Sequence, residues 1–181
     1  FLIENLPFHY SYEGEALNDY LKLFELHGKG TMYPDKVLDS IKRACGPFHL
    51  DRLEAKSDIY IDPAYLIENI EWAFKVWHEQ PWGKNVSFDD FCEYLLPYRI
   101  GDEPLEKWRG EYRDYFVPLL DSLYRGTDVI EAASAMQHYA ERAGYRHNTD
   151  FNMPHHGALS LRKCWMGTCR EYCDYIMYMF R

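Results

Sequence analysis

The chain has 181 residues, 47% of them hydrophobic, so it is long enough to bury a core as one domain or as two small ones. Its 20 Lys and Arg against 29 Asp and Glu give a formal net charge of −9, which argues against a phosphate-binding surface for nucleic acid. No apolar run approaches the length of a membrane span, and 5 scattered cysteines are too few for a disulfide scaffold.

Helix signals dominate the chain from its N-terminal part onward. Apolar residues at helical spacing predict helices over residues 13–27 and 34–45, ended by Gly28 and by Gly46-Pro47. A short extended piece is expected at 58–61. Asp62-Pro63 then gives a clear helix start, an N-cap followed by Pro in the first turn, and the helix should run to about Gln80. Its apolar face is expected to carry Ile67, Ile70, Phe74 and Trp77.

Three further helices are expected before residue 145. Ser87 should cap one that ends at Pro97, with Asp90 placed as in a capping box. A longer one is expected over 105–124, kinked or split by Pro118. The third should cover 129–143 and end at Gly144. Its buried stripe is expected to consist of Ile130, Ala133, Met136, Tyr139 and Ala140.

The remaining residues predict a loop, a short turn and a last helix. Asn, Asp, Pro and Gly are frequent in 145–158, which therefore should be a loop. Ser160 is expected to cap a short turn to Lys163, and the last helix to begin near Thr168. The sequence therefore predicts a mainly α protein, an irregular multi-helix bundle, with a helical N-terminal region at 1–145 followed by a distinct segment at 146–181.

Cys169 is the leading candidate for a functional side chain. It follows Gly167 and Thr168 at the expected start of the last helix, where free N–H groups and the helix dipole favour a thiolate. Thr168 can cap this helix and leave N–H groups near Cys169 as oxyanion donors. Spacing predicts that one inward face carries Cys169, Tyr172, Cys173, Ile176 and Phe180, which would leave the nucleophile partly buried.

Two other interpretations of the cysteines stay open. Cysteine on an apolar helix face is usually packing, which is also the expected role of Cys45 and Cys92. A metal site would use Cys164, Cys169 and Cys173 with His155 and His156, but this spacing is not one that zinc sites commonly use. A nucleophilic cysteine also needs a base. The upstream candidates are His147, His155 and His156, with Asp150 nearby, and nothing in the sequence assigns one of them to Cys169.

The segment 158–172 resembles the nucleophile segment of the transglutaminase-like superfamily. That family shows a Gly-x-Cys-x-acid-aromatic pattern at the start of its central helix, matched here by Gly167, Cys169, Glu171 and Tyr172. Cys173 departs from the pattern, because the family often has a small residue there. Upstream, residues 62–70, 87–94 and 96–99 are similar to the helical N-terminal part of bacterial transglutaminase-like proteins, which are often secreted or lipid-anchored.

The resemblance implies a cysteine enzyme that acts on peptide or other amide bonds through a thioester acyl-enzyme. Cys169 would be its catalytic nucleophile, its substrate a peptide or protein, and it would use no cofactor and no metal. The intact family domain is α+β, so 146–181 would begin a transglutaminase-like core. A base His and an orienting Asp are expected on strands after Arg181, and the chain alone is therefore expected to be inactive. We expect hydrolysis rather than cross-linking, because bacterial relatives are often peptidases.

An alternative from another class is a non-catalytic helical recognition or scaffold module of a bacterial surface protein. The acidic composition and the aromatic content of 17% favour it, with Trp82 and Trp108 expected in or near loops. The chain begins at Phe1 rather than Met, so the N-terminus does not define localisation; the resemblance implies an extracytoplasmic one. The acyl acceptor and the oligomeric state are not defined by the sequence.

Overall fold

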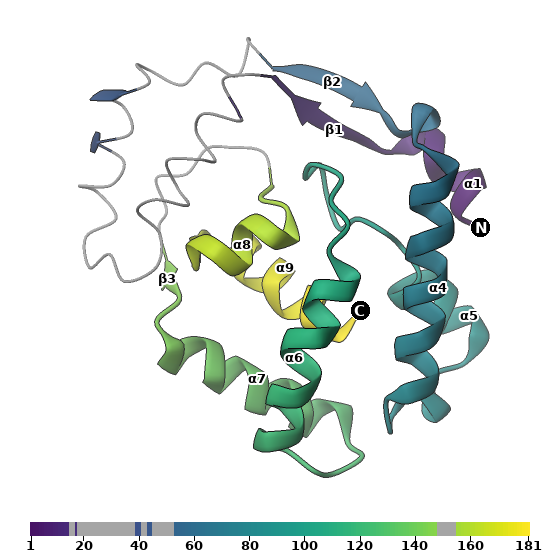
Figure 1. The fold of residues 1–181 in the computed structure, drawn as a ribbon, viewed down its shortest axis with the longest axis vertical. Coiled ribbons are helices and arrows are strands. Elements are labelled where there is room, and N and C mark those ends of the chain that lie inside the picture. The colour runs from purple at the N-terminus through teal and green to yellow at the C-terminus, as the bar shows by residue number, and fades with distance from the viewer. Residues whose placement is uncertain (15–16, 18–38, 41–42, 45–52, 148–154) are drawn as a thin grey trace.

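The computed structural model describes residues 1–14, 17, 39–40, 43–44, 53–147 and 155–181 (Figure 1). As predicted, the described part is mainly helical. Its α-helices are α1 (Leu2–Asn5), α4 (Pro63–Glu79), α5 (Phe88–Asp90), α6 (Arg109–Leu123), α7 (Val129–Ala143), α8 (Ala158–Cys164) and α9 (Cys169–Phe180). Short 3-10 turns lie at η1 (Leu6–Phe8), η3 (Asp58–Tyr60) and η4 (Gly83–Asn85), and a π-helical turn, η5 (Phe91–Leu95), follows α5.

Two small sheets accompany the helices in the described part of the chain. Strand β1 (Tyr10–Glu13) pairs antiparallel with β2 (Glu54–Ser57), and its register places Tyr10 opposite Ser57. Strand β3 (Arg146–His147) pairs in parallel with β4 (Met166–Gly167). The second pair matters for the site, because β4 leads directly into α9.

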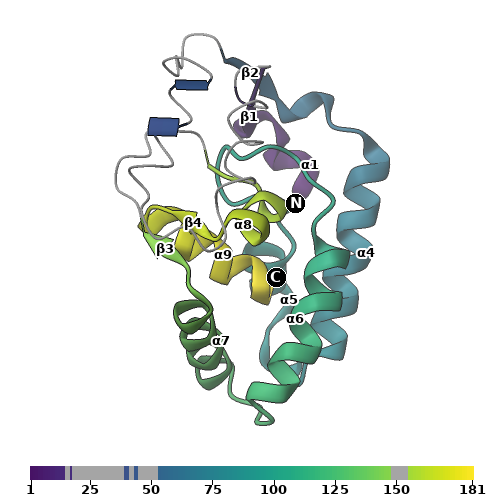
Figure 2. The same cartoon turned by 60° about the vertical axis from the view of Figure 1, so that its left-hand side comes forward.

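Helix α9 lies in the middle of the molecule, against α6, α7 and α8 (Figures 1 and 2). An aromatic-rich core joins these four helices; its large members are Trp108, Tyr112, Phe116, Met136, Leu161, Trp165, Tyr175 and Tyr178. This core takes residues from both sides of position 145. A second core lies between α4, the N-terminal turns and η5, and contains Leu2, Leu6, Ala73, Phe91, Leu96 and Tyr98.

Several predicted helix ends are confirmed. The Asp62 carboxylate accepts a hydrogen bond from the Ala64 N–H at 2.9 Å, and α4 begins at Pro63 as expected. Ser87 caps α5 through the Asp90 N–H. Gly144 ends α7 with a φ of 96°, a left-handed conformation that glycine adopts without steric cost.

Other expectations were wrong in detail. Ile67 and Ile130 were placed on buried stripes but are 57% and 77% exposed, because the buried faces of α4 and α7 centre on the smaller Ala73 and Ala132. Pro118 does not split α6, which continues through it. The extended piece expected at 58–61 is the turn η3, and the strand lies just before it.

Two predicted helices fall largely outside the described residues. The one expected over 13–27 was to begin at Glu13, which instead ends β1. Beyond Leu17, that helix is not covered by the description, and of the one at 34–45 only residues 39–40 and 43–44 are, all helical. The loop expected at 145–158 contains β3, and α8 starts at Ala158 rather than at a Ser160 cap.

A buried ion pair connects η3 to the segment after Pro97. The Arg99 guanidinium donates to both carboxylate oxygens of Asp58, at 2.7 and 2.8 Å, and to the Glu103 carbonyl at 2.7 Å. The Glu103 carboxylate in turn accepts from the Tyr178 hydroxyl on α9 at 2.7 Å. Through these bonds the 97–103 segment positions the buried face of α9.

A second buried cation, Arg109, donates hydrogen bonds to backbone oxygens at the end of η5. Its guanidinium donates to the carbonyls of Leu95 at 2.6 Å and Pro97 at 3.0 Å, and to the Asn69 side-chain oxygen at 2.5 Å. It also bonds the carbonyl of Arg181. The end of a helix leaves carbonyls without intrahelical donors, and Arg109 satisfies several of them at once.

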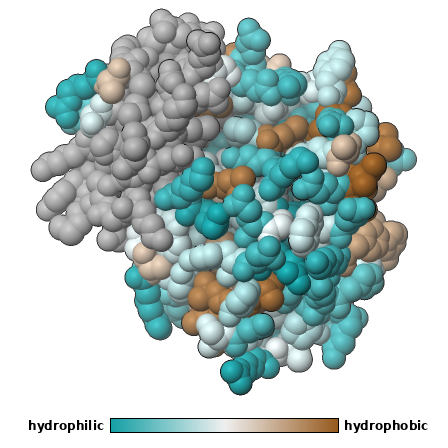
Figure 3. All heavy atoms as spheres, in the orientation of Figure 1, coloured by the Kyte–Doolittle hydropathy of each residue, from teal (hydrophilic) through white to brown (hydrophobic). Residues whose placement is uncertain are grey.

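The surface visible in Figure 3 is largely hydrophilic, with small hydrophobic groups between charged side chains. Among the described residues, none of the helices combines the length and the apolar character that crossing a bilayer requires.

Candidate functional site

The start of α9 is fixed by a capping box. Thr168 is the N-cap: its hydroxyl accepts from the Arg170 N–H at 3.2 Å and donates to the Glu171 carboxylate, which also accepts from the Thr168 N–H at 2.8 Å. Burial acts to raise the pKa of Glu171, but the hydrogen bonds from Thr168 and Arg170 outweigh it and lower the pKa to about 2. The first turn of α9 is therefore held by an ionised, almost fully buried carboxylate.

Cys169 is the first residue of α9, as predicted, but it does not point into the core. The thiols of Cys169 and Cys173 are both exposed, whereas Glu171, Asp174, Tyr175 and Tyr178 form the buried face. The prediction of an inward face was therefore wrong for both cysteines, whereas Tyr172, Ile176 and Phe180 are half-buried and pack against the aromatic core as expected. The spacing was helical, but Tyr175, two residues after Cys173, and Tyr178 fill more of the aromatic core than the cysteines would. Exposure of the thiol also means that core packing does not explain Cys169.

Gly167 is enclosed by the first turn of α9. A Cβ atom added there would lie 2.5 Å from the Glu171 Cβ and 2.8 Å from the Tyr145 hydroxyl oxygen. Both distances are shorter than real Cβ contacts, and the Glu171 atom belongs to the rigid part of a buried side chain. Glycine at this position lets the chain pass close under the helix start that carries Cys169.

Substitution Gly167→Ala should therefore destabilise the fold by about 1–3 kcal/mol, the usual cost of overpacking. Gly110→Ala is the matched control, because its added Cβ would meet only the Trp72 ring at 3.0 Å and alanine favours the α6 helix. Urea unfolding of both variants measures the difference. Equal stability of the two variants would contradict a special requirement for glycine at 167.

The structure separates the three upstream histidines. The ladder between β3 and β4 sets His147 opposite Gly167, two residues before Cys169, and its side chain is exposed. His155 instead bonds the Asp174 carboxylate through Nδ1 at 2.7 Å. Asp174 is five residues after Cys169, about 140° round the helix, so His155 faces the other side of α9. Asp150 lies outside the described residues.

His155 belongs to an acidic cluster that the sequence did not predict. Its backbone N–H donates to Asp102 at 3.0 Å, and its ring lies where a Gly101 side chain would be. Burial lowers the pKa of His155, but the hydrogen bond and charge of Asp174 outweigh it, so the pKa is raised. Burial also raises the pKa of Asp174. No sequence motif connects residues 102, 155 and 174, which only the fold brings together.

His156 is buried beside the same helix start. Its ring is 2% exposed and its Nδ1 lies 3.4 Å from the Ser160 hydroxyl. Burial lowers its pKa to about 4, against a weaker opposing effect of the Glu171 charge. His156 is therefore neutral at physiological pH. It is a buried residue just before α8 rather than a base for the exposed Cys169.

No hydrogen bond to the Cys169 thiol is present among the described residues. The capping bonds occupy the N–H groups of Arg170 and Glu171, and within that same part of the chain no bond occupies the N–H of Cys169. A carbonyl oxygen approaching this helix end would find that N–H and the positive end of the helix dipole.

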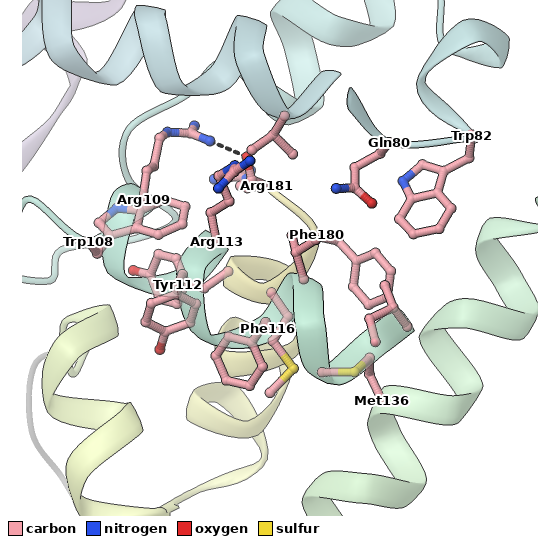
Figure 4. A pocket seen from close by; sticks show the side chains of 15 residues that line it. Gln80, Trp82, Trp108, Arg109, Tyr112, Arg113, Phe116, Met136, Phe180 and Arg181 are labelled. Carbon is pink, nitrogen blue, oxygen red and sulfur yellow. Dashed lines mark hydrogen bonds between the residues drawn. The ribbon is translucent and has the colours of Figure 1, made fainter. Parts of the chain in front are cut away.

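The pocket of Figure 4 lies between α4, α6, α7 and the end of α9. Its space for solvent is about 20 Å³, enough for about one water molecule, and Cys169 does not line it. Trp108 lies at the end of a loop, as expected, where it is the N-cap of α6; its side chain is 3% exposed and lines this pocket. Trp82 is half-buried and also borders a second, open hollow of about 500 Å³ with Ile130 and Phe180.

The described cysteine and histidine side chains, which do not include that of Cys164, do not assemble into a conventional metal centre. Within the described ranges, no group of three or more His, Cys, Asp and Glu side chains is placed to hold a metal ion. Comparison with known proteins adds nothing to this: no family model, no curated protein and no solved structure matches the chain. The functional argument therefore depends on the geometry around Cys169.

Proposed function

We propose that Cys169 is the nucleophile of a transglutaminase-like cysteine enzyme that acts on peptide or other amide bonds. The observation that supports this most is the exposed thiol at the first position of a capped, 12-residue helix. Such a position stabilises a thiolate and offers a backbone N–H to the developing oxyanion. Gly167 lets the backbone pass close beneath the same helix start.

In the proposed reaction the Cys169 thiolate attacks the carbonyl carbon of the amide and forms a tetrahedral oxyanion. The C–N bond then breaks, the amine takes a proton and leaves, and the acyl group remains on sulfur as a thioester. In hydrolysis, water attacks the thioester carbonyl, the C–S bond breaks, and the acyl group leaves as a carboxylic acid while the thiol is regenerated. Hydrolysis is preferred here over transfer to an amine, as the resemblance implies. His147 lies beside the motif, and the family resemblance places the base beyond Arg181.

Acylation of the thiol tests the proposal directly. The protein is incubated with p-nitrophenyl acetate at pH 7, and peptide mass spectrometry locates the acetyl group. We expect Cys169 to be acylated about two- to five-fold faster than Cys173, which corresponds to the 0.3–1 kcal/mol that a helix N-terminus contributes to a negative charge. Iodoacetamide labelling should show the same order of rates.

Cys173 is a matched internal control, since it is exposed on the same helix one turn further on. Cys169→Ala should remove the fast phase, and Cys173→Ala should keep it. Because the Cys169 thiol is exposed, its removal should change the free energy of unfolding little. Equal acylation of both cysteines would refute the proposed nucleophile.

A second candidate function, a non-catalytic recognition module, is favoured by the open hollow of about 500 Å³ beside Trp82. Its lining is mostly apolar, with Val86, Leu95 and Ile130 from three separate segments. In that case ligand binding would respond to Trp82→Ala and be unaffected by Cys169→Ala. Comparison of Trp82→Ala with Cys169→Ala thus separates the two functions.

A further inference from the structure

We propose that Cys169 and Cys173 together form a two-thiolate site for copper(I), and that the bound ion blocks the nucleophile. The inference depends on the proposed function only for its consequence, the inhibition. The site itself depends on two exposed thiols on one helix face.

The two thiols are arranged on one face of α9. Both belong to α9, four residues apart, and both are exposed. Residues four apart on a helix lie one above the other, with about 5–6 Å between their Cβ atoms. The family pattern that Cys169 matches commonly has a small residue at the second position, so the paired thiol is a feature of this chain.

The separation between the two Cβ atoms suits a bridging metal ion better than a disulfide. A disulfide needs Cβ atoms about 3.5–4.5 Å apart, so Cys169 and Cys173 could form one only if the first turn of α9 were distorted. That turn is held by the Thr168–Glu171 capping box. With metal–sulfur bonds of about 2.3 Å, a bridging ion allows the two sulfurs to stay about 4–5 Å apart and the helix to stay intact.

The chemistry of two thiolate ligands favours copper(I) as the bound ion. Thiolate sulfur is a soft ligand and favours copper(I) or zinc. Zinc in proteins takes four ligands, or three and a water, and the described residues offer no group of three suitable side chains. Copper(I) can be bound by only two thiolate sulfurs in a linear arrangement. The surroundings also suit an anionic sulfur at Cys169, because it lies in the first turn of the helix, where negative charge is favourable.

Copper(I) binding is measured by competition with bathocuproine disulfonate, anaerobically and in the presence of ascorbate. We expect one tightly held equivalent in the wild-type protein and its loss in both Cys169→Ser and Cys173→Ser. Cys92→Ser is the control: this thiol is half-buried near η5 and should leave that equivalent unchanged. Retention of the equivalent in Cys173→Ser, or failure of the wild-type protein to compete with the chelator, would overturn the proposed site.

Inhibition is tested by acylation with p-nitrophenyl acetate, with and without copper(I). At free copper(I) about ten times the dissociation constant, mass action should leave about a tenth of Cys169 reactive. In Cys173→Ser the ion should no longer slow acylation. Binding of copper(I) without preferential acylation of Cys169 would keep the metal site and refute the proposed function. Preferential acylation without copper(I) binding would refute the metal site alone.

Discussion

Asp58→Asn should destabilise the protein by about 3–5 kcal/mol, because it leaves the guanidinium of Arg99 buried without a counter-charge. The carboxylate and guanidinium side chains are 1% and 2% exposed, and two hydrogen bonds join them. The carbonyls of Gly101 and Glu103 would remain as partners for the cation but carry no full charge. Chemical unfolding of the variant measures the loss.

Glu68→Gln is the matched control for this ion pair. Glu68 bonds Lys107 at 2.5 Å, but both side chains are exposed, so removal of the charge should cost less than about 1 kcal/mol. The double variant Asp58→Asn/Arg99→Met removes both buried charges and should be more stable than Asp58→Asn alone. If the single variant cost no more than Glu68→Gln, the buried pair would have no special importance.

Acidification should cost about 3 kcal/mol of stability through His156 alone by pH 4, since each pKa unit is worth about 1.4 kcal/mol. Its pKa is lowered to about 4 in the fold, below the ordinary value of 6.5. Between these values the unfolded chain binds the proton and the folded chain does not. Stability is therefore intact above pH 6.5 and falls as the pH drops towards 4.

The comparison of His156→Gln with the wild type isolates this contribution from the other titrating groups. Glutamine keeps a polar side chain near Ser160 but binds no proton. Its destabilisation relative to the wild type should be about 2–3 kcal/mol smaller at pH 4 than at pH 7.5. His138→Gln is the control, because His138 is 61% exposed. A penalty for His156→Gln that is the same at both pH values would contradict the argument.

Local signals in the sequence predicted the helix ends well. Asp62, Thr168 and Gly144 each act through their own backbone or that of a residue two or three positions away, so their effect does not depend on the rest of the fold. The same holds for the position of Cys169 at the first turn of α9. These features need only the identity of neighbouring residues.

Burial was harder to predict, because it depends on what each helix packs against. Helical spacing correctly placed Met136 and Ala140 in a buried stripe of α7, but it also placed Ile130 there, which is exposed. On α9 the same reasoning chose the face of the cysteines, whereas the aromatic core selected Tyr175 and Tyr178. The helical period determines which residues share a face of the helix, but it does not determine which face is buried.

The polar cluster of Asp102, His155 and Asp174 was not predictable for a different reason. Its members are 53 and 19 residues apart in sequence, and they meet only because the 97–103 segment lies along the buried side of α9. Each residue alone looks like an ordinary surface group. Contacts of this kind are defined by the tertiary structure, and they are what excludes His155 as a base for Cys169.

Arg109 connects three segments through one buried side chain. One side chain holds the end of η5 and the middle of α4, from the first turn of α6. If any one of these segments moved away alone, the cation would stay behind in the interior with part of its hydrogen bonds missing, which is costly. We therefore expect the three segments to form a single unit of local unfolding, whose backbone amides exchange together rather than one helix at a time.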